Sequence, residues 1–138
     1  MVMNNLFNNY SPEFLKVYRM DACNSNLENA ANEYAALLPN NIDIMILSLG
    51  EDGHIASLFP NSSALFEARH FVTPVIGPKA PFKRLTISPS VIKNAHEVFV
   101  LALGAHKRAV YEEALRNPID INSIPARLVL NRTWIFGE

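Results

Sequence analysis

The sequence predicts an α/β protein built on a parallel sheet, and three observations support this fold class. Residues 41–50 form a nearly continuous apolar run closed by Gly50, which is typical of a strand buried on both faces. Residues 96–104 form a second run of this kind, and a helical pattern follows it at residues 105–117. Because strands alternate with helices along the chain, we expect a sheet covered on both faces.

The remaining elements fit the same fold class. Residues 25–39 predict a helix, since Ser25 and Glu28 have the spacing of a capping box and Pro39 ends the apolar periodicity. Residues 83–90 alternate between polar and apolar side chains, as a strand with one polar face does. Two short closing strands are expected at residues 126–130 and 133–137.

Composition and charge narrow the class of protein. The chain is 49% hydrophobic, and its 12 basic and 13 acidic residues give a net charge of −1. Without a basic excess we expect no nucleic-acid partner, and the apolar runs are too short to span a membrane. The N-terminus shows no signal-peptide pattern, and the single Cys23 excludes an intrachain disulfide and a cysteine-based zinc site. We expect a soluble, cytoplasmic protein that needs no metal or cofactor.

The length of 138 residues predicts a single α/β domain, residues 1–138. Ten of the 15 asparagines fall in the first 41 positions. We therefore expect residues 1–41 to form a looser N-terminal segment with one helix, and residues 42–138 to form the catalytic core portion.

Polar residues and glycines follow the first predicted strand, where open α/β sheets bind ligands. Gly50 and Gly53 would let the backbone turn tightly and approach a ligand closely. The backbone N–H groups at such a strand end could bind an oxyanion. His54 can act as a base at neutral pH, and Asp52 is close enough in sequence to orient it. The spacing leaves an alternative open, in which Glu51 and Asp52 are solvated loop residues and His54 caps a helix.

Two further features suggest a bound phosphate. Lys107 and Arg108 fall in the first turn of a predicted helix, where the helix dipole disfavours cations unless an anion binds there. Arg84 shares a strand face with Thr86, and bidentate phosphate recognition would explain a guanidinium at that position. The alternatives are two surface cations on the helix and an edge strand that faces water.

Three stretches together resemble the 6-phosphogluconolactonases, which hydrolyse 6-phosphogluconolactone in the pentose phosphate pathway. These are LGEDGHIASLFP, KRLTISPSVIKNAHEVFVLALGAHKRAV and RTWIF, at residues 49–60, 83–110 and 132–136. The likeness extends over nearly the whole chain from about residue 26 onward. It implies a Rossmann-like parallel-sheet sandwich of the type shared with the glucosamine-6-phosphate deaminases, here truncated at the N-terminus.

The resemblance also implies roles for particular residues. His54 matches the histidine that activates the hydrolytic water, and Asp52 matches the acidic residue of the same loop. Arg84 and Lys107 match positions that contact the substrate phosphate. The implied substrate is a small sugar-phosphate lactone, 6-phospho-D-glucono-1,5-lactone, which would be attacked at its carbonyl carbon with Gly50 and Gly53 shaping the oxyanion site.

One position separates the lactonases from the related deaminases. The deaminases resemble D-G-H-I-A-F-N-E-P, with a glutamate five residues after the histidine that takes part in sugar ring opening. Here that position is Phe59, which can neither donate nor accept a proton. The sequence therefore favours the lactonase; a glucosamine-6-phosphate deaminase or isomerase and a non-catalytic sugar-phosphate-binding fragment remain as alternatives.

Two N-terminal motifs of these lactonases have no counterpart in this chain. A glycine-rich S-G-G-x-T-P phosphate loop and a G-D-E-R element normally precede the region that matches. We expect either a fragment or a natural short form that begins at an internal methionine. Without the first strands, the sheet would keep an uncovered edge and unburied apolar faces, so we expect self-association through that edge.

Overall fold

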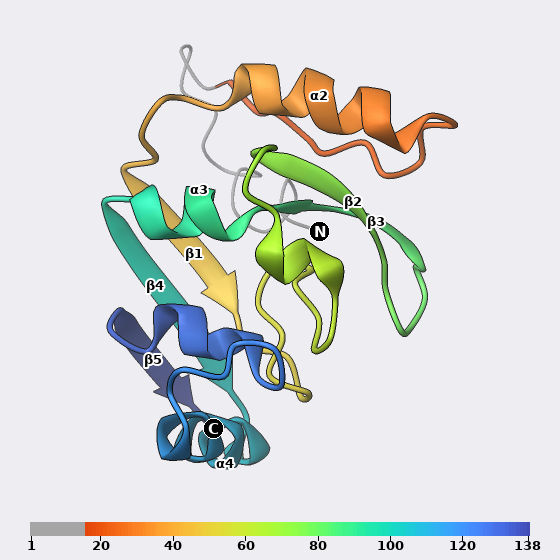
Figure 1. Cartoon of the computed structure of the whole chain (residues 1–138). Helices are drawn as coiled ribbons and strands as arrows, with labels where there is room; N and C mark the ends of the chain where they lie inside the picture. Colours follow the sequence, from red (N-terminus) through yellow and green to blue (C-terminus); the bar gives the residue numbers. More distant parts are fainter. Residues whose placement is uncertain (1–15) are drawn as a thin grey trace.

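The computed structural model describes residues 16–138, and it confirms the α/β fold class (Figure 1). Residues 1–15 of the expected looser segment lie outside the described residues. No helix within residues 16–138 is long and apolar enough to cross a membrane. In chain order the elements are α2 (Leu27–Leu37), β1 (Ile44–Ser48), η1 (Ser63–Phe66), β2 (Val72–Ile76), β3 (Lys83–Ile87), α3 (Pro89–Asn94), β4 (Glu97–Leu103), α4 (Ala105–Arg116), η2 (Pro125–Val129) and β5 (Thr133–Gly137).

A three-stranded parallel sheet forms the centre of the fold. Its strand order is β1-β4-β5, with Ile46 beside Phe99 and Phe99 beside Thr133. The expected parallel pairing of the strands near 41–50 and 96–104 is confirmed, and β5 is the expected last strand. Because all three strands run the same way, the segments that follow β1 and β4 leave the sheet at the same edge (Figure 1).

The other two strands form a separate antiparallel ribbon. β2 pairs with β3 in a register that places Val75 opposite Arg84. The strand expected at residues 83–90 is confirmed over Lys83–Ile87, whereas β2 was not expected because it contains Pro74. A proline is tolerated there because β2 has only one strand neighbour, so one edge of its backbone needs no N–H donor.

Two local expectations are wrong. The strand expected at residues 126–130 is the 3-10 helix η2, which begins at Pro125 and packs Val129 into the core. Helix α2 is capped by Asn26 and not by Ser25, because the Asn26 side chain accepts a hydrogen bond of 3.0 Å from the Asn29 N–H. For α2, the neighbouring Asn26 thus takes the capping position expected for Ser25.

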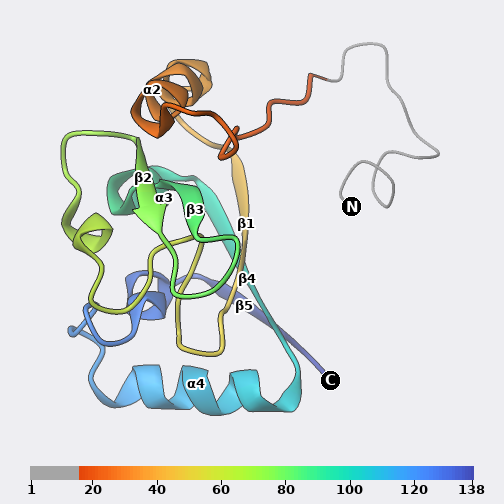
Figure 2. The same cartoon turned by 90° about the vertical axis from the view of Figure 1, so that its right-hand side faces the viewer.

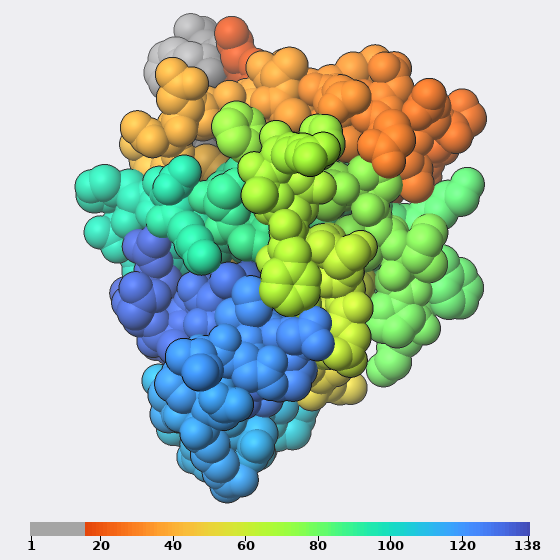
Figure 3. All heavy atoms as spheres, in the orientation of Figure 1, coloured from red at the N-terminus to blue at the C-terminus, as the bar shows by residue number. Residues whose placement is uncertain are grey.

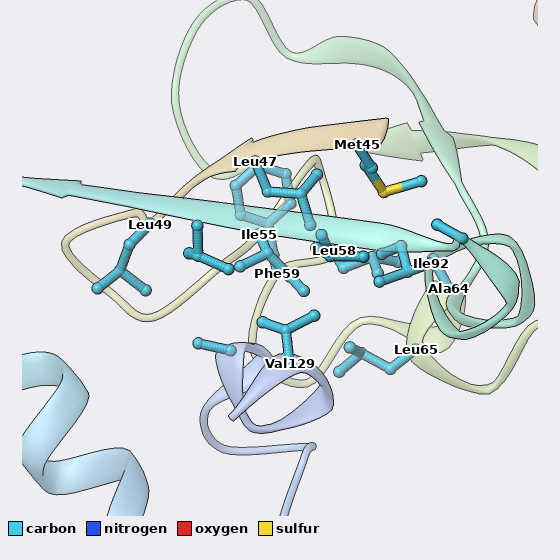
Figure 4. Packing of buried hydrophobic residues seen from close by; sticks show 14 of the residues in the cluster. Met45, Leu47, Leu49, Ile55, Leu58, Phe59, Ala64, Leu65, Ile92 and Val129 are labelled. Atoms are coloured by element: carbon cyan, nitrogen blue, oxygen red, sulfur yellow. The ribbon is translucent and has the colours of Figure 1, made fainter. Parts of the chain in front are cut away.

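The main hydrophobic core lies on one face of the parallel sheet (Figure 4). β1 and β4 contribute alternate side chains to it, and α3 and η2 cover that face. A second, smaller cluster joins α2 to the β2–β3 ribbon. The labelled members of the main core in Figure 4 are Met45, Leu47, Leu49, Ile55, Leu58, Phe59, Ala64, Leu65, Ile92 and Val129.

Among residues 16–138 nothing covers the opposite face of the same sheet, which corrects the expectation of a sheet covered on both faces. Burial alternates along β1, so that Ile44 and Ile46 are 63% and 66% exposed. Leu103 and Ile135, from the two neighbouring strands, are also exposed on the sheet. Figure 2 shows the sheet edge-on, with α3, η2 and the β2–β3 ribbon all on one side. Within residues 16–138, the apolar run of β1 is thus buried on a single face.

Candidate active site

The loop that follows β1 is a tight turn made by two glycines. Gly50 donates a hydrogen bond of 2.8 Å to the His54 carbonyl, and Gly53 donates one of 3.2 Å to the Gly50 carbonyl. Gly53 has a positive φ of 83°, and a Cβ there would lie 2.7 Å from a methyl carbon of Ile124. A Cβ on Gly50 would overlap the His54 ring. The glycines therefore let the imidazole lie directly against the turn.

Asp52 holds His54 through both its backbone and its ring. The Asp52 Oδ1 atom lies 2.5 Å from His54 Nδ1 and accepts a bond of 3.1 Å from the His54 N–H. Partial burial raises the pKa of the Asp52 carboxyl, but the hydrogen bonds from the His54 ring and backbone outweigh this and hold that pKa below its ordinary value. An ionised carboxylate can only accept, so a proton sits on His54 Nδ1, and in the neutral ring Nε2 carries the lone pair.

The residues after His54 anchor this loop in the core. Ile55 and Leu58 are fully buried beneath the sheet (Figure 4). The Ser57 N–H donates a hydrogen bond of 3.1 Å to Thr86 Oγ1, which ties the loop to β3. The Gly53 carbonyl accepts a bond of 2.9 Å from the Ala126 N–H in η2. His54 is thus carried by a segment that is anchored in the core, to β3 and to η2.

Beyond Leu58, the same segment is also hydrogen-bonded to the loop that precedes η2. The Asn61 N–H donates a bond of 2.9 Å to the Asn122 carbonyl, and the Asn122 side chain donates one of 2.8 Å to Asn61 Oδ1. Figure 3 shows the segments around these positions in contact on the molecular surface. These two hydrogen bonds connect the segment that carries His54 to the loop before η2.

Arg84 lies beside this loop, as the phosphate-site expectation requires. Its Nε and Nη2 groups donate to the carbonyls of Pro81 and Lys79, at 2.9 and 3.2 Å. The guanidinium carbon lies 5.2 Å from the centroid of the Phe59 ring, and that ring lies 4.7 Å from the His54 ring. The structure therefore brings Asp52, His54 and Arg84 together around Phe59, a contact that the spacing along the chain does not reveal.

The polar side of β3 is only partly open to water, because Arg84 is half-buried and Thr86 is buried. Thr86 and Ser88 are 1% and 0% exposed, so the alternative of a solvated strand face is wrong for these two residues. Thr86 Oγ1 accepts from Ser57 and donates to the Ile87 carbonyl at 3.2 Å. Its buried hydroxyl serves to hold the loop and the strand together.

Lys107 lies on the neighbouring element at the same edge of the sheet. Helix α4 begins at Ala105 after Gly104, which provides no side-chain cap. His106 Nε2 lies 3.7 Å from Glu51 Oε1, so the first turn of α4 adjoins the loop after β1. No hydrogen bond or ion pair within residues 16–138 joins the Lys107 side chain to Asp52, His54 or Arg84.

Other expectations for this region need correction. No helix follows His54 directly, because the next helical turn, η1, begins at Ser63; His54 is therefore not a helix cap. Glu51 and Asp52 are both exposed, with 69% and 42% of their side chains accessible, as that alternative expected, but Asp52 also pairs with His54. The N–H groups of Gly53 and His54 are used within the turn, which does not fit their expected role as oxyanion donors. Gly50 and Gly53 shape the loop in this conformation.

A broad groove borders the site between η1 and the β2–β3 ribbon. Its volume is about 1240 Å³, and Asp52, Phe59 and Gly77 belong to its lining, whereas His54, Arg84 and Lys107 do not. Within residues 16–138, no three histidine, cysteine, aspartate or glutamate side chains are grouped so as to hold a metal ion. The arrangement presents an oriented imidazole next to an accessible hollow.

Proteins with similar sequences and structures include several 6-phosphogluconolactonases. A 6-phosphogluconolactonase of Borreliella burgdorferi is 38% identical over 65% of this chain and 39% of its own length. The human 6-phosphogluconolactonase is 35% identical over 81% of this chain and 48% of its own length. The crystal structure of a 6-phosphogluconolactonase from Shewanella baltica OS155 matches with a TM-score of 0.69 and 28% identity, over 80% of this chain and 50% of that one.

The chain thus spans about half the length of the relatives that it matches. The structural match confirms the expected Rossmann-like fold of the lactonase and deaminase type. A model of the glucosamine-6-phosphate isomerases/6-phosphogluconolactonase family matches residues 1–136. The chain therefore belongs to the glucosamine-6-phosphate isomerase/6-phosphogluconolactonase family.

Proposed function

We propose that this protein hydrolyses 6-phospho-D-glucono-1,5-lactone to 6-phosphogluconate, as a step of the pentose phosphate pathway. The observation that carries the proposal is the 2.5 Å contact between Asp52 and His54 at the end of β1. It leaves Nε2 of a fixed imidazole free to accept a proton, which is what the hydrolysis of an ester requires. The similarity to 6-phosphogluconolactonases supplies the substrate class.

In the proposed reaction, His54 Nε2 removes a proton from a water molecule as the water oxygen attacks the C1 carbonyl. The tetrahedral intermediate then collapses and the bond between C1 and the ring oxygen breaks. The protonated imidazole returns its proton to the departing ring oxygen, which becomes the C5 hydroxyl. Asp52 keeps the imidazole in one tautomer and stabilises its positive charge between the two proton transfers.

Arg84 and Lys107 are proposed to bind the phosphate of the lactone. Pro81 and Lys79 carbonyls hold the guanidinium of Arg84 through two N–H groups, and an arginine has five. Lys107 would add a point charge at the N-terminus of α4, where a bound anion also interacts favourably with the helix dipole. Binding the phosphate at a distance from C1 would align the lactone with His54.

A deaminase acting on an amino-sugar phosphate is the less favoured function. Ring opening would need a proton carrier five residues after His54, and Phe59 is there, with only 6% of its surface exposed. Ammonia release from glucosamine 6-phosphate would favour that function. Binding of 6-phosphogluconate without turnover of the lactone would favour a non-catalytic sugar-phosphate binder.

The test is hydrolysis of freshly prepared 6-phosphogluconolactone by the 138-residue chain, compared with a His54→Ala variant. We expect acceleration above the spontaneous rate that the substitution abolishes. The matched control is His96→Ala, which removes a surface histidine whose side chain is 80% exposed. Acceleration that survives in His54→Ala would contradict the proposed mechanism, and no acceleration by the unmodified chain would contradict the proposed activity.

We further propose that the chain is a single cytoplasmic domain that self-associates through its open sheet. The exposed Ile44 and Ile46 lie on β1, an edge strand of the sheet, and apolar side chains on an open sheet favour association. Analytical ultracentrifugation should show a concentration-dependent increase in mass that Ile46→Ser weakens. A monomer at every concentration would contradict self-association.

A further inference from the structure

Phe59 contacts both His54 and Arg84 of the proposed site. Its ring centroid lies 4.7 Å from that of the His54 imidazole, with the two planes inclined by 48°. The Arg84 guanidinium carbon lies 5.2 Å from the same centroid. Phe59 is 6% exposed and belongs to the main core, so the packing around it holds its ring in place. The base and the guanidinium thus share one buried aromatic neighbour.

A glycine lies against each of these two polar side chains. A Cβ on Gly50 would overlap the His54 ring. A Cβ on Gly77 would lie 2.7 Å from Arg84 Nε and 3.3 Å from Phe59 Cε2. His54 and Arg84 therefore each contact a glycine and the Phe59 ring, and this crowding limits the rotamers that either side chain can adopt.

We infer that Phe59 is a positioning residue that sets the distance and orientation between the His54 base and the Arg84 guanidinium. The inference rests on the proposed lactone hydrolysis, in which His54 acts at C1 while Arg84 binds the phosphate. An aromatic ring suits this role because its face attracts a cation and it packs against an imidazole at an incline. An aliphatic side chain of similar volume would fill the core without these directional contacts.

The test compares Phe59→Leu with Phe59→Tyr. Because a displacement of about 1 Å can lower a rate by about 100-fold, we expect Phe59→Leu to lower kcat/KM by about that factor. Both constants should change, with kcat falling through His54 and KM rising through Arg84. Phe59→Tyr should recover most of the activity, because it keeps the aromatic ring that contacts His54 and Arg84.

The matched control is Ile92→Ala, which removes a fully buried side chain of α3 from the same core. It should lower the unfolding temperature and leave kcat and KM unchanged. If Phe59→Leu lowers only the unfolding temperature, as Ile92→Ala does, and leaves kcat, KM and the pH profile of kcat/KM unchanged, the inference is overturned.

Two measurements separate this inference from the proposed activity. The first is the NMR titration of the His54 ring, and the second is the affinity for inorganic phosphate. Both should change in Phe59→Leu and return toward the unmodified values in Phe59→Tyr, whether or not the chain hydrolyses the lactone. If the chain is inactive, the proposed activity fails, and these two measurements still decide the inference: unchanged values in Phe59→Leu overturn it.

Discussion

Two turns follow neighbouring strands at the same edge of the parallel sheet, yet they are built differently. The turn after β1 is closed by hydrogen bonds among Gly50, Gly53 and His54, and the buried residues that follow anchor it. The turn after β4 begins α4 at Gly104 without a side-chain cap and carries the exposed His106 and the partly buried Lys107. One turn is fixed by the core, and the other carries a lysine in the first turn of a helix.

The difference matches the demands of the two proposed tasks. A general base must keep its nitrogen within hydrogen-bond distance of one water molecule, so the loop of His54 has to be rigid. A phosphate can be bound by a lysine on a flexible stem, because an ammonium group acts as a point charge with several usable orientations. The packed first turn therefore suits the proposed base, and the positive charge of Lys107 in the second turn suits the proposed phosphate binding.

The largest expected effect comes from changing the glycine of each turn. In Gly50→Ala the new methyl group would overlap the His54 ring, so the imidazole must move and kcat should fall by about 100- to 10,000-fold. In Gly104→Ala the new group would meet the exposed His106 ring at 3.0 Å, and the positive φ of 105° would strain the backbone, so the variant should lose stability while kcat falls much less than in Gly50→Ala. Steady-state kinetics of the two variants make the comparison, and equal losses would show that the two turns do not differ in this way.

The next effect tests the orientation of the base. Asp52→Asn removes the charge that holds the His54 ring, and a hydrogen bond to a charged group contributes about 1.5–3 kcal/mol. This energy corresponds to a fall in kcat of roughly 10- to 160-fold. Glu51→Gln is the matched control, since it neutralises the adjacent exposed carboxylate. A kcat in Asp52→Asn equal to that of the control would contradict the proposed role of Asp52.

A smaller effect tests the second turn. Lys107→Ala should raise KM by about tenfold with little change in kcat, because the lysine is proposed to bind phosphate and not to take part in proton transfer. Lys107→Arg should restore part of the affinity. Arg116→Ala, which removes the same charge from the far end of α4, is the control. A fall in kcat at unchanged KM in Lys107→Ala would assign the lysine a different role.

The smallest effect is on stability in acid. Because the pKa of Asp52 is lower in the folded protein than its ordinary value of 3.8, its pairing with His54 contributes stability above that value. The contribution is lost as the pH falls through the lowered folded-state pKa. Unfolding temperatures of the unmodified chain and of Asp52→Asn, followed from neutral pH to about pH 2.5, should converge in acid. A constant difference across the range would show that the ionised carboxylate does not stabilise the fold.

Local patterns in the sequence account for several elements and fail for others in a consistent way. β1 and β4 could be predicted because each is a nearly continuous apolar run, and α4 because its residues follow a helical pattern. η2 could not, since its apolar residues resemble a strand and its conformation depends on Arg127. That buried side chain donates to the carbonyls of Ala114 and Asp120, at 3.1 and 2.7 Å, and so joins η2 to α4 and its following loop.

The sequence by itself determined the α/β class, the glycine turn after the first strand and the pairing of Asp52 with His54, because these depend on residues close together in the chain. Only the tertiary structure decided that Arg84 meets His54 across Phe59 and that Thr86 holds Ser57. It also decided that one face of the sheet is open within residues 16–138. These contacts join segments about 30 residues apart, and such pairing depends on how whole elements pack against the core rather than on any local preference.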